Sequence, residues 1–394
     1  MLARDIPIFS ENRWDQFCAR LDWPLIGIVA CIMTLGLVMV ASASMPLAER
    51  ATGQPFHYFQ HQLGYAFMGV LAAMVALKIP MKIWQDNGFL VMSMALLLLL
   101  VVLIPGVGYE KNGSSRWLDL PLFRVQISEL TRLMLMVYLS GYLVRRSEEL
   151  RERIRGTLKP VLVLSIACLL LLMEPDFGAA AVLMLTALTM IYIAGARLLP
   201  FSAMFAAIMA ALWMLAWMAP YRVRRLTSFL DPWNDPQNTG YQLTNSLVAI
   251  GSGQWFGVGL GESIQKMHYL PEAHTDFIFA ILAEELGLMG TLLVLVLFMA
   301  LIGRIFMIAG RAAAGKRWFS VYLASGIGAW FGIQAFINLG VNMGVLPTKG
   351  LTLPLISYGG SSLVVVSFMV GMLLRVEMEN RDPSGSPASA RAVR

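Results

Sequence analysis

Long apolar runs recur along the chain, and charged and polar residues gather between them. Each run comes close to the roughly 20 residues with which an α-helix crosses the hydrocarbon core of a bilayer. The alternation of apolar and polar positions that marks barrel strands does not recur. The pattern therefore predicts an all-α polytopic membrane protein with ten transmembrane helices. The predicted spans are 24–44, 63–79, 88–104, 127–144, 160–173, 178–194, 199–219, 277–302, 321–343 and 355–374.

The fifth and sixth spans form one apolar stretch, which is interrupted by the run Glu174-Pro175-Asp176-Phe177-Gly178. Proline removes a backbone donor and kinks a helix. Two carboxylates in the same run would be unfavourable in lipid. The run is therefore predicted to separate two helices.

Composition agrees with a membrane protein and excludes other classes. The 394-residue chain is 58% hydrophobic and 14% charged, whereas soluble domains are roughly 45–50% apolar and about 25% charged. A soluble enzyme, a disordered chain and a disulfide scaffold are thereby excluded. Cys18, Cys31 and Cys168 show no metal-ligand spacing, and none lies in a predicted outer loop, so no disulfide or metal site is predicted from them.

The distribution of positive charge sets the orientation. Of the 30 Lys and Arg residues, 20 fall in segments that are inner when the N-terminus is inside, 9 fall in outer segments, and Arg132 lies within a span. Because Lys and Arg accumulate on the cytoplasmic side, the topology is predicted to be N-in/C-in. The net charge of +6 is explained by the Lys and Arg residues that set this orientation, so it predicts no nucleic-acid partner.

The predicted organisation has three parts. A cytoplasmic N-terminal segment (1–23) precedes the transmembrane domain (24–374), and a disordered cytoplasmic tail (375–394) follows it. The outer loops are 45–62, 105–126 and 220–276, and the last, between helices seven and eight, is too long for a passive connection. Residues 241–250 predict a short amphipathic helix at the membrane surface. The aromatic residues of this loop that suit the membrane–water boundary are Trp233, Trp255 and Tyr269.

Asp276 is the strongest candidate for chemistry, because it stands where the loop 220–276 meets the eighth span. Two interpretations are open for it. It is either a capping residue whose charge complements the helix dipole, or a partly desolvated general base that faces a substrate lying along the membrane. His274, two residues earlier, is interpreted as an exposed loop histidine rather than as a second acid or base.

Carboxylates also fall inside two predicted spans. Glu284 and Glu285 lie in the eighth span, with Glu284 about 12 Å deeper than Asp276 at about 1.5 Å per residue. A functional role and a hydrogen bond to a neighbouring span are both open for them. Glu129 and Arg132 in the fourth span are three residues apart and share one helix face, which favours a structural ion pair.

Basic residues at the predicted outer boundary suit a ligand that carries phosphate, because arginine binds phosphate through two parallel hydrogen bonds. Lys349 stands among apolar residues at this boundary and needs an anionic partner or water. For the cluster at 222–225, contact with lipid headgroups is the alternative. The arginines concerned are Arg116, Arg124, Arg222, Arg224 and Arg225.

Motifs along nearly the whole chain, in one order, resemble the SEDS family (shape, elongation, division and sporulation). The run 347–352 is similar to the division branch of that family rather than to the elongation branch. Ile127 and Arg132 depart from the family pattern, which usually has Pro and commonly has Lys at these positions. The motifs are Asn112-Gly113-Ser114-Ser115-Arg116-Trp117, Ser128-Glu129, Glu174-Pro175-Asp176-Phe177-Gly178, the segment LPEAHTDFIFA at 270–280 and the segment LPLISYGGSS at 353–362.

The resemblance implies a ten-span peptidoglycan glycosyltransferase of the bacterial inner membrane, located at the division septum. Its substrate would be lipid II, a disaccharide-pentapeptide on undecaprenyl pyrophosphate. Its partners would be a division-specific class B penicillin-binding protein and small bitopic regulators of the division machinery. The resemblance also implies Asp276 as the catalytic base. The other implied site residues are the basic Arg124, Arg132 and Lys349 and the acidic Glu129 and Asp176.

The residues alone fit this chemistry. A carboxylate would take the proton of an acceptor sugar hydroxyl, and fixed cations would stabilise a departing diphosphate. A single base without a second carboxylate nucleophile predicts inversion at the anomeric carbon. No ligand cluster calls for a metal, so no cofactor is predicted and a divalent cation stays an open option. The rival interpretations are a transporter that flips lipid II and a non-catalytic scaffold.

Overall fold

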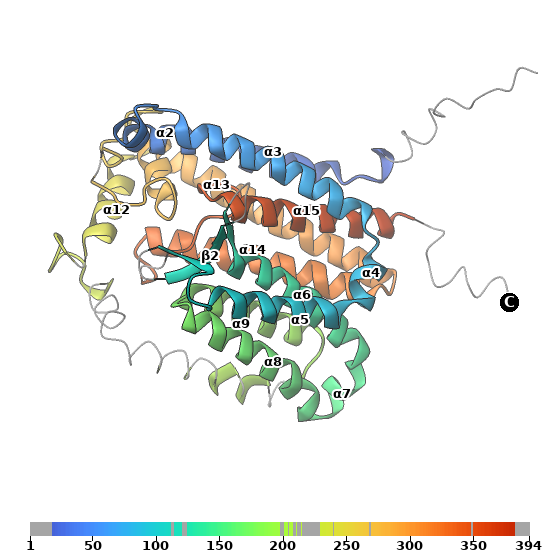
Figure 1. The fold of residues 1–394 in the computed structure, drawn as a ribbon. Helices are drawn as coiled ribbons and strands as arrows, with labels where there is room; N and C mark the ends of the chain where they lie inside the picture. The colour runs from blue at the N-terminus through green and yellow to red at the C-terminus, as the bar shows by residue number, and fades with distance from the viewer. Residues whose placement is uncertain are drawn as a thin grey trace, which may run out of the picture.

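The computed structural model describes residues 18–111, 114–119, 124–197, 201–203, 205–207, 210, 214, 229–238, 240–267, 269–347 and 350–382. In this part of the chain, helices lie side by side in a bundle (Figure 1). Six of them are long and apolar enough to cross a membrane, and two shorter apolar helices accompany them. The longer helices are α2 (Trp23–Thr52), α3 (His57–Lys78), α5 (Gly88–Val102), α6 (Ile127–Arg145), α8 (Ile154–Met173), α9 (Phe177–Ile193), α12 (Tyr241–Ser252), α13 (Ile278–Ala314), α14 (Trp318–Asn342) and α15 (Gly360–Asn380), and the short ones are α4 (Met81–Asp86) and α7 (Ser147–Glu152).

The apolar runs predicted several of these helices closely. The predicted fourth span, 127–144, corresponds to α6, and the sixth, 178–194, corresponds to α9. The predicted break between the fifth and sixth spans is confirmed, because α8 ends at Met173. Asp176 then caps α9 by accepting a hydrogen bond from the main-chain nitrogen of Ala179 at 3.0 Å. Such a cap satisfies one of the donors that a helix start leaves unpaired.

Some predicted segments lie wholly or largely outside the described residues. These are the seventh span at 199–219, residues 1–17 of the N-terminal segment and residues 383–394 of the tail. The tail prediction began too early, because α15 continues to Asn380. Arg375 and Glu379 form an ion pair at 2.9 Å one turn apart, which supports helix in this stretch.

The predicted eighth span, 277–302, is wrong in length and in shape. α13 runs to Ala314, and its backbone leaves helical geometry at Gly287, where φ is +64° and ψ is −160°. Glycine reaches this conformation without the steric penalty of a side chain. An added methyl group at Gly287 would lie 2.3 Å from the main-chain nitrogen of Gly257, so the outer loop packs directly against the bend. The residues before Gly287 therefore belong with the loop rather than with a straight span.

A small sheet corrects the all-α prediction. β1 (Gly108–Lys111), β2 (Ser114–Asp119) and β3 (Arg124–Gln126) form an antiparallel sheet in the order β1-β2-β3. It lies within the predicted outer loop 105–126. Strands of three to six residues offer too few positions for a clear two-residue period. Because β3 ends where α6 begins, the sheet fixes how the chain enters that helix.

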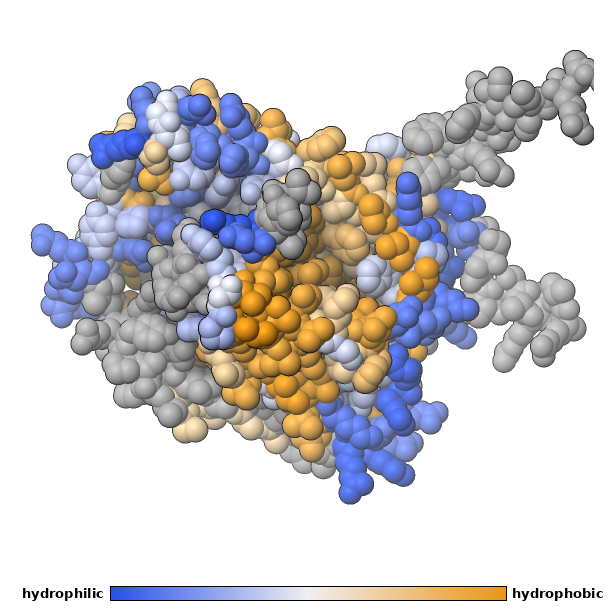
Figure 2. Space-filling view, viewed as in Figure 1, coloured by the Kyte–Doolittle hydropathy of each residue, from blue (hydrophilic) through white to orange (hydrophobic). Residues whose placement is uncertain are grey.

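The bundle has two polar ends and an apolar middle. Figure 2 shows a hydrophobic band between hydrophilic surfaces, as expected for a protein that spans a membrane. The sheet and α12 lie at one end, whereas α4, α7 and both described chain ends lie at the other (Figure 1). Arg20 and Asp382 join the two chain ends through an ion pair at 3.2 Å.

α12 confirms the short helix predicted at 241–250. Its apolar face is buried, through Leu243 and Ala249 among others, and it packs on α13 and α14. Ser246 on the same face donates a hydrogen bond to the main-chain carbonyl of Asn342 at 2.8 Å. The helix therefore joins the outer loop to the end of α14.

α6 is the most enclosed helix of the predicted spans. Apart from Leu130, all its residues from 127 to 143 are buried, and it packs on α5, α9 and α14. Polar side chains on such a helix have no water to solvate them, so they need partners within the protein. Glu129 and Arg132 are therefore expected to bond to neighbouring side chains.

Candidate active site

Asp276 lies at the end of the outer loop, two residues before α13 begins, and its side chain is partly buried. Phe277, and not Asp276, takes the N-cap position of α13, so the capping interpretation of Asp276 is wrong by one position. The main-chain carbonyl of Asp276 accepts hydrogen bonds from Asn338 and Asn342, at 2.9 and 3.0 Å. The residue is therefore tied to α14 as well as to its own helix.

The segment that follows Lys349 lies against the Asp276 carboxylate. An added methyl group at Gly350 would come within 3.1 Å of Asp276 Oδ2, so the main chain approaches the acid closely. Lys349 itself lies outside the described residues. The residue after it, Gly350, therefore lies beside the acidic candidate.

Three buried amide side chains run along α14 beside this contact. Gln334, Asn338 and Asn342 are at most 2% exposed, and their four-residue spacing puts them on one helix face. Gln334 donates to the main-chain carbonyl of Thr352 at 3.1 Å, and Asn338 donates to that of Leu351 at 2.6 Å. We name these three residues the amide stripe. The sequence analysis missed it, although amides repeated every fourth residue in an apolar span were a visible signal.

Glu129 and Arg132 form the predicted ion pair, with side chains at most 5% exposed. Arg132 also donates to Gln334 Oε1 at 3.0 Å and to the main-chain carbonyl of Ser128 at 3.3 Å. Each of the three guanidinium nitrogens therefore bonds to a protein partner. Arg132 does not contact Asp276 directly. It bonds to Gln334 of the amide stripe, and the other two members of the stripe bond to the main chain of Asp276.

Arg116 on β2 holds the turn between α8 and α9. Its guanidinium donates to the main-chain carbonyls of Glu174 and Pro175, at 3.1 and 2.6 Å. Asp176 of the same turn is the cap of α9. Arg116 and Asp176, which were both predicted to bind substrate, thus make structural contacts in this turn. The turn nevertheless lies beside the candidate site, because an added methyl group at Gly178 would come within 3.1 Å of the side chain of Leu351, the residue after Gly350.

Glu174 gives this turn a pH-dependent stability. The residue is 1% exposed, and within the described part of the chain neither carboxylate oxygen has a hydrogen-bond partner. Burial raises the pKa of the Glu174 carboxyl from 4.5 to about 8, the Asp176 carboxylate adds to the rise, and Arg116 opposes it. The folded chain therefore retains a proton that the unfolded chain releases between about pH 4.5 and 8. Stability should fall as pH rises through this window, by up to about 1.4 kcal/mol per pH unit.

The variant Glu174→Gln should remove this slope, because glutamine cannot ionise. Thermal unfolding midpoints of the detergent-solubilised protein between pH 6 and 8 provide the measurement. Glu152→Gln, which changes an exposed acid on α7, is the control and should keep the wild-type slope. An unchanged slope in Glu174→Gln would show that another group carries the pH dependence.

Arg124 is engaged within the sheet. It pairs with Asp119 at 2.6 Å, and its guanidinium lies 4.0 Å above the ring of Tyr109. The hydrogen bond to Asp119 raises the pKa of Arg124. Both side chains of the pair are about half exposed, and such pairs contribute little to stability. Arg124 can therefore exchange Asp119 for an anionic ligand at small cost. The predicted cluster at 222–225 lies outside the described residues.

His274 is buried, so its interpretation as an exposed loop histidine is wrong. It is 9% exposed, and its ring lies 5.1 Å from that of Tyr58 and 5.6 Å from that of Tyr358. Its main-chain carbonyl accepts a hydrogen bond from the nitrogen of Tyr358 at 2.9 Å. Aromatic rings from α3 and from the chain before α15 thus enclose the residue two positions before Asp276.

Glu284 and Glu285 have structural partners, which favours the second of their two interpretations. Glu284 accepts a hydrogen bond from Ser263 and another from a main-chain nitrogen of the same turn. Glu285 pairs with Lys266 at 2.7 Å and accepts a hydrogen bond from Ser42 at 2.6 Å. The Lys266 and Glu285 side chains are at most 4% exposed. These contacts fasten the outer loop to α13 and α2.

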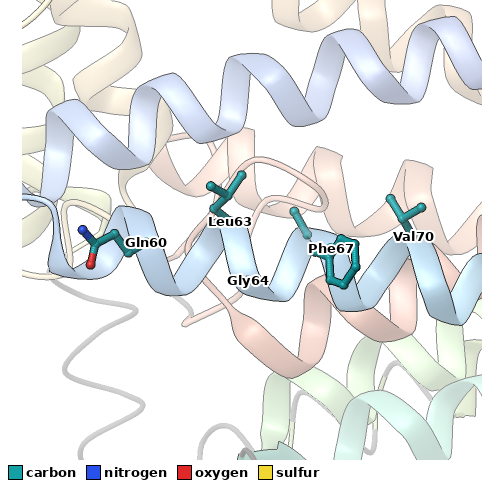
Figure 3. A pocket seen from close by; sticks show the side chains of 6 residues that line it. Gln60, Leu63, Gly64, Phe67 and Val70 are labelled. Atoms are coloured by element: carbon teal, nitrogen blue, oxygen red, sulfur yellow. The ribbon is translucent and has the colours of Figure 1, made fainter.

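An open apolar groove of about 650 Å³ runs along α3. Leu63, Phe67 and Val70 project into it from one face of the helix, and Gln60 stands at its left end in the view of Figure 3. An added methyl group at Gly64 would touch nothing within 4 Å, so this glycine leaves the groove open. The groove begins two residues after Tyr58, whose ring contacts His274.

Metal ligands are not grouped in the described part of the chain. No three His, Cys, Asp or Glu side chains lie there in an arrangement that could hold a metal ion. Glu129 and Glu174 each interact electrostatically with Asp176. Asp176 and Glu129 are already engaged as a helix cap and in an ion pair. A divalent cation stays an open option.

Residues 22–382 match the FtsW/RodA/SpoVE family, described as cell cycle proteins. Similar relatives are named as probable peptidoglycan glycosyltransferase FtsW. The protein of Thioalkalivibrio sulfidiphilus is 53% identical over 364 residues, which cover 92% of this chain and 91% of the relative. That of Nitrosococcus halophilus is 53% identical over 362 residues, with coverage of 92% and 93%. That of Coxiella burnetii is 49% identical over 358 residues, with coverage of 90% and 96%.

Solved structures share the fold. One, from work on the structural coordination of polymerization and crosslinking by a peptidoglycan synthase complex, matches with a TM-score of 0.74 and 29% identity. It covers 92% of this chain and 99% of the solved chain. The crystal structure of the Rod shape determining protein RodA of Thermus thermophilus matches with a TM-score of 0.68 and 28% identity, with coverage of 92% and 98%.

Proposed function

Because the chain belongs to the FtsW/RodA/SpoVE family of cell cycle proteins, we propose that it is a peptidoglycan glycosyltransferase of the division machinery. It polymerises lipid II at the outer face of the bacterial inner membrane, at the septum. Relatives of about 50% identity that cover nine-tenths of the chain and carry this enzyme name support the assignment. The topology that suits it has ten spans, cytoplasmic termini and a periplasmic loop at 220–276.

The observation that carries the mechanism is the Asp276 carboxylate, which is partly buried and lies close to the main chain of Gly350. Asp276 acts as general base: it takes the proton of the acceptor sugar hydroxyl as that oxygen attacks the anomeric carbon of the donor. The bond from this carbon to the diphosphate oxygen breaks, and the electron pair leaves with the lipid diphosphate. With one base and no carboxylate nucleophile, the configuration inverts.

The diphosphate needs fixed positive charge as it leaves. Lys349 is the first candidate, since its neighbour Gly350 lies against the Asp276 carboxylate. Arg124 is the second, because its exposed pair with Asp119 can open for an anionic ligand. The other predicted site residues have a positioning role, because they hold the helices and the turn around this position. They are Arg116, Glu129, Arg132 and Asp176.

The groove on α3 suits the polyprenyl chain of the substrate. It is lined by apolar side chains, as a hydrocarbon tail requires. The end at Gln60 is two residues from Tyr58, whose ring contacts His274, and His274 lies two residues from Asp276. A lipid whose tail occupies this groove would therefore present its diphosphate near the base.

The partner is a division-specific class B penicillin-binding protein, with the small regulators of the division machinery. The support is the fold match to a chain solved in work on a peptidoglycan synthase complex that coordinates polymerization and crosslinking. A glycan strand made by one subunit is the natural substrate of a crosslinking subunit beside it.

Reconstitution tests the function against its rivals. The purified full-length chain is placed in liposomes with labelled lipid II and its penicillin-binding partner, and both glycan polymer and lipid movement between leaflets are measured. We expect polymer. Lipid movement without polymer would instead support the flippase, and neither activity would support the scaffold.

A further inference from the structure

Two asparagines of the amide stripe hold the part of the chain that carries Asp276. Asn338 and Asn342, one helical turn apart on α14, both donate to the main-chain carbonyl of Asp276. Asn342 Oδ1 also accepts a hydrogen bond from the nitrogen of Ala280 at 3.2 Å. This nitrogen lies in the first turn of α13 and also donates to the main-chain carbonyl of Phe277 at 3.0 Å, so Asn342 is its second acceptor. One pair of side chains thus fixes both the acidic residue and the helix that follows it.

Asn338 also reaches the opposite side of the site. Its Nδ2 donates to the main-chain carbonyl of Leu351 at 2.6 Å as well as to that of Asp276. A side-chain amide carries two hydrogens on this nitrogen, so it can serve both carbonyls at once. One side chain therefore sets the spacing between Asp276 and the segment that follows Lys349.

The backbone at Asp276 has little other regular support. The residues from 271 to 277 form turns rather than helix or strand. The nitrogen of the same peptide group, that of Phe277, donates to the main-chain carbonyl of Glu272 at 3.2 Å, within the same run of turns. Without the two amide donors, the carbonyl of Asp276 loses its bonds to α14, and the turn can shift and carry the carboxylate with it. A displacement of about 1 Å in a reacting group can lower a rate by about a hundredfold.

We propose that Asn338 and Asn342 are positioning residues for glycosyl transfer, which hold the Asp276 carboxylate at a fixed place beside Gly350 and Leu351. The inference rests on the proposed function, in which Asp276 is the base. It differs from a purely structural role, in which the asparagines only satisfy buried carbonyl groups. A structural role would change the amount of folded protein but not the turnover of the folded fraction.

The test compares Asn338→Ala and Asn342→Ala with wild type, as full-length chains in complex with the penicillin-binding partner. Polymerisation of lipid II is measured per folded molecule over a range of lipid II concentrations. We expect kcat to fall about 10-fold to 100-fold, with KM within about twofold of wild type, because positioning affects the transition state more than ground-state binding. If Asn338→Ala does not fold, Asn338→Ser, which keeps a single donor, takes its place with the same expectation.

Asn380→Ala is the matched control. Asn380 likewise donates through Nδ2 to a main-chain carbonyl, that of Ile308 on α13 at 3.2 Å, but it is the last residue of α15, near the described C-terminal end. Its loss should leave kcat unchanged. Wild-type kcat in both Asn338 and Asn342 variants, or an equal fall in Asn380→Ala, would overturn the proposal. Activity in Asp276→Ala would instead overturn the proposed base, so the two failures are distinguishable.

Discussion

Replacing Asp276 by asparagine is expected to reduce glycan polymerisation by at least about 100-fold, the lower range for loss of a general base. Asparagine has nearly the same shape as aspartate but cannot accept the proton of the acceptor hydroxyl at neutral pH. The main-chain carbonyl that Asn338 and Asn342 hold is unchanged by the substitution. Folding and binding of the partner should therefore persist, and the effect should fall on kcat.

Glu272→Gln is the matched control for Asp276→Asn. Glu272 is an exposed acid four residues earlier in the same segment, and its carboxylate bonds only locally, to Thr275 at 2.8 Å among the contacts described. This variant should polymerise lipid II within about twofold of wild type, as expected of a surface substitution. Polymer from Asp276→Asn at the wild-type rate would remove Asp276 from the chemistry and leave the carboxylate with a binding or structural role.

The sequence predicted those elements whose signal is local. A membrane helix shows itself as an apolar run whatever it packs against, which is why α6 and α9 were located within a residue or two. The break at Glu174–Gly178 could be predicted equally well, since proline and two carboxylates act through their own backbone and charge. The position of Asp276 at the end of the loop followed from the same runs.

Features that depend on contacts with a distant part of the chain could not be predicted from the sequence. The bend in α13 exists because the loop around Gly257 packs against Gly287, and no property of 277–302 alone reveals that contact. Glu284 and Glu285 were interpreted as acids inside a membrane span because the sequence did not predict the bend at Gly287. Their partners come from the loop and from α2, up to 243 residues away.

The arginines show the same limit for the site. Arg116 and Arg124 were assigned to a phosphate ligand from their charge and their place in an outer loop. Three short strands that the sequence did not reveal bring Arg116 onto the turn after α8 and Arg124 onto Asp119. The residue type predicted the chemistry that these groups can perform, but the tertiary contacts decide which of them are available for it.

The buried pair in α6 gives the largest expected effect on stability. Arg132→Ala should lower the free energy of unfolding by about 3–5 kcal/mol, because it leaves the Glu129 carboxylate buried without a counter-charge. Among the described residues Glu129 Oε2 has no hydrogen-bond partner, so none of them offers a donor that is already in place to compensate. Arg132→Lys should cost less, since it keeps the charge, but it loses the planar fork that also bonds Gln334. Unfolding of the solubilised protein, followed by heat or denaturant, measures both.

Arg146→Ala is the control, because Arg146 and Glu149 have the same three-residue spacing but an exposed arginine. It should change stability by less than about 1 kcal/mol. The double variant Glu129→Gln with Arg132→Met should recover much of the loss, since it removes both charges together. If Arg132→Ala were as stable as Arg146→Ala, Glu129 would have to be neutral in the folded protein. Arg132 would then serve the site through Gln334 alone, and a selective loss of turnover without loss of stability would identify that role.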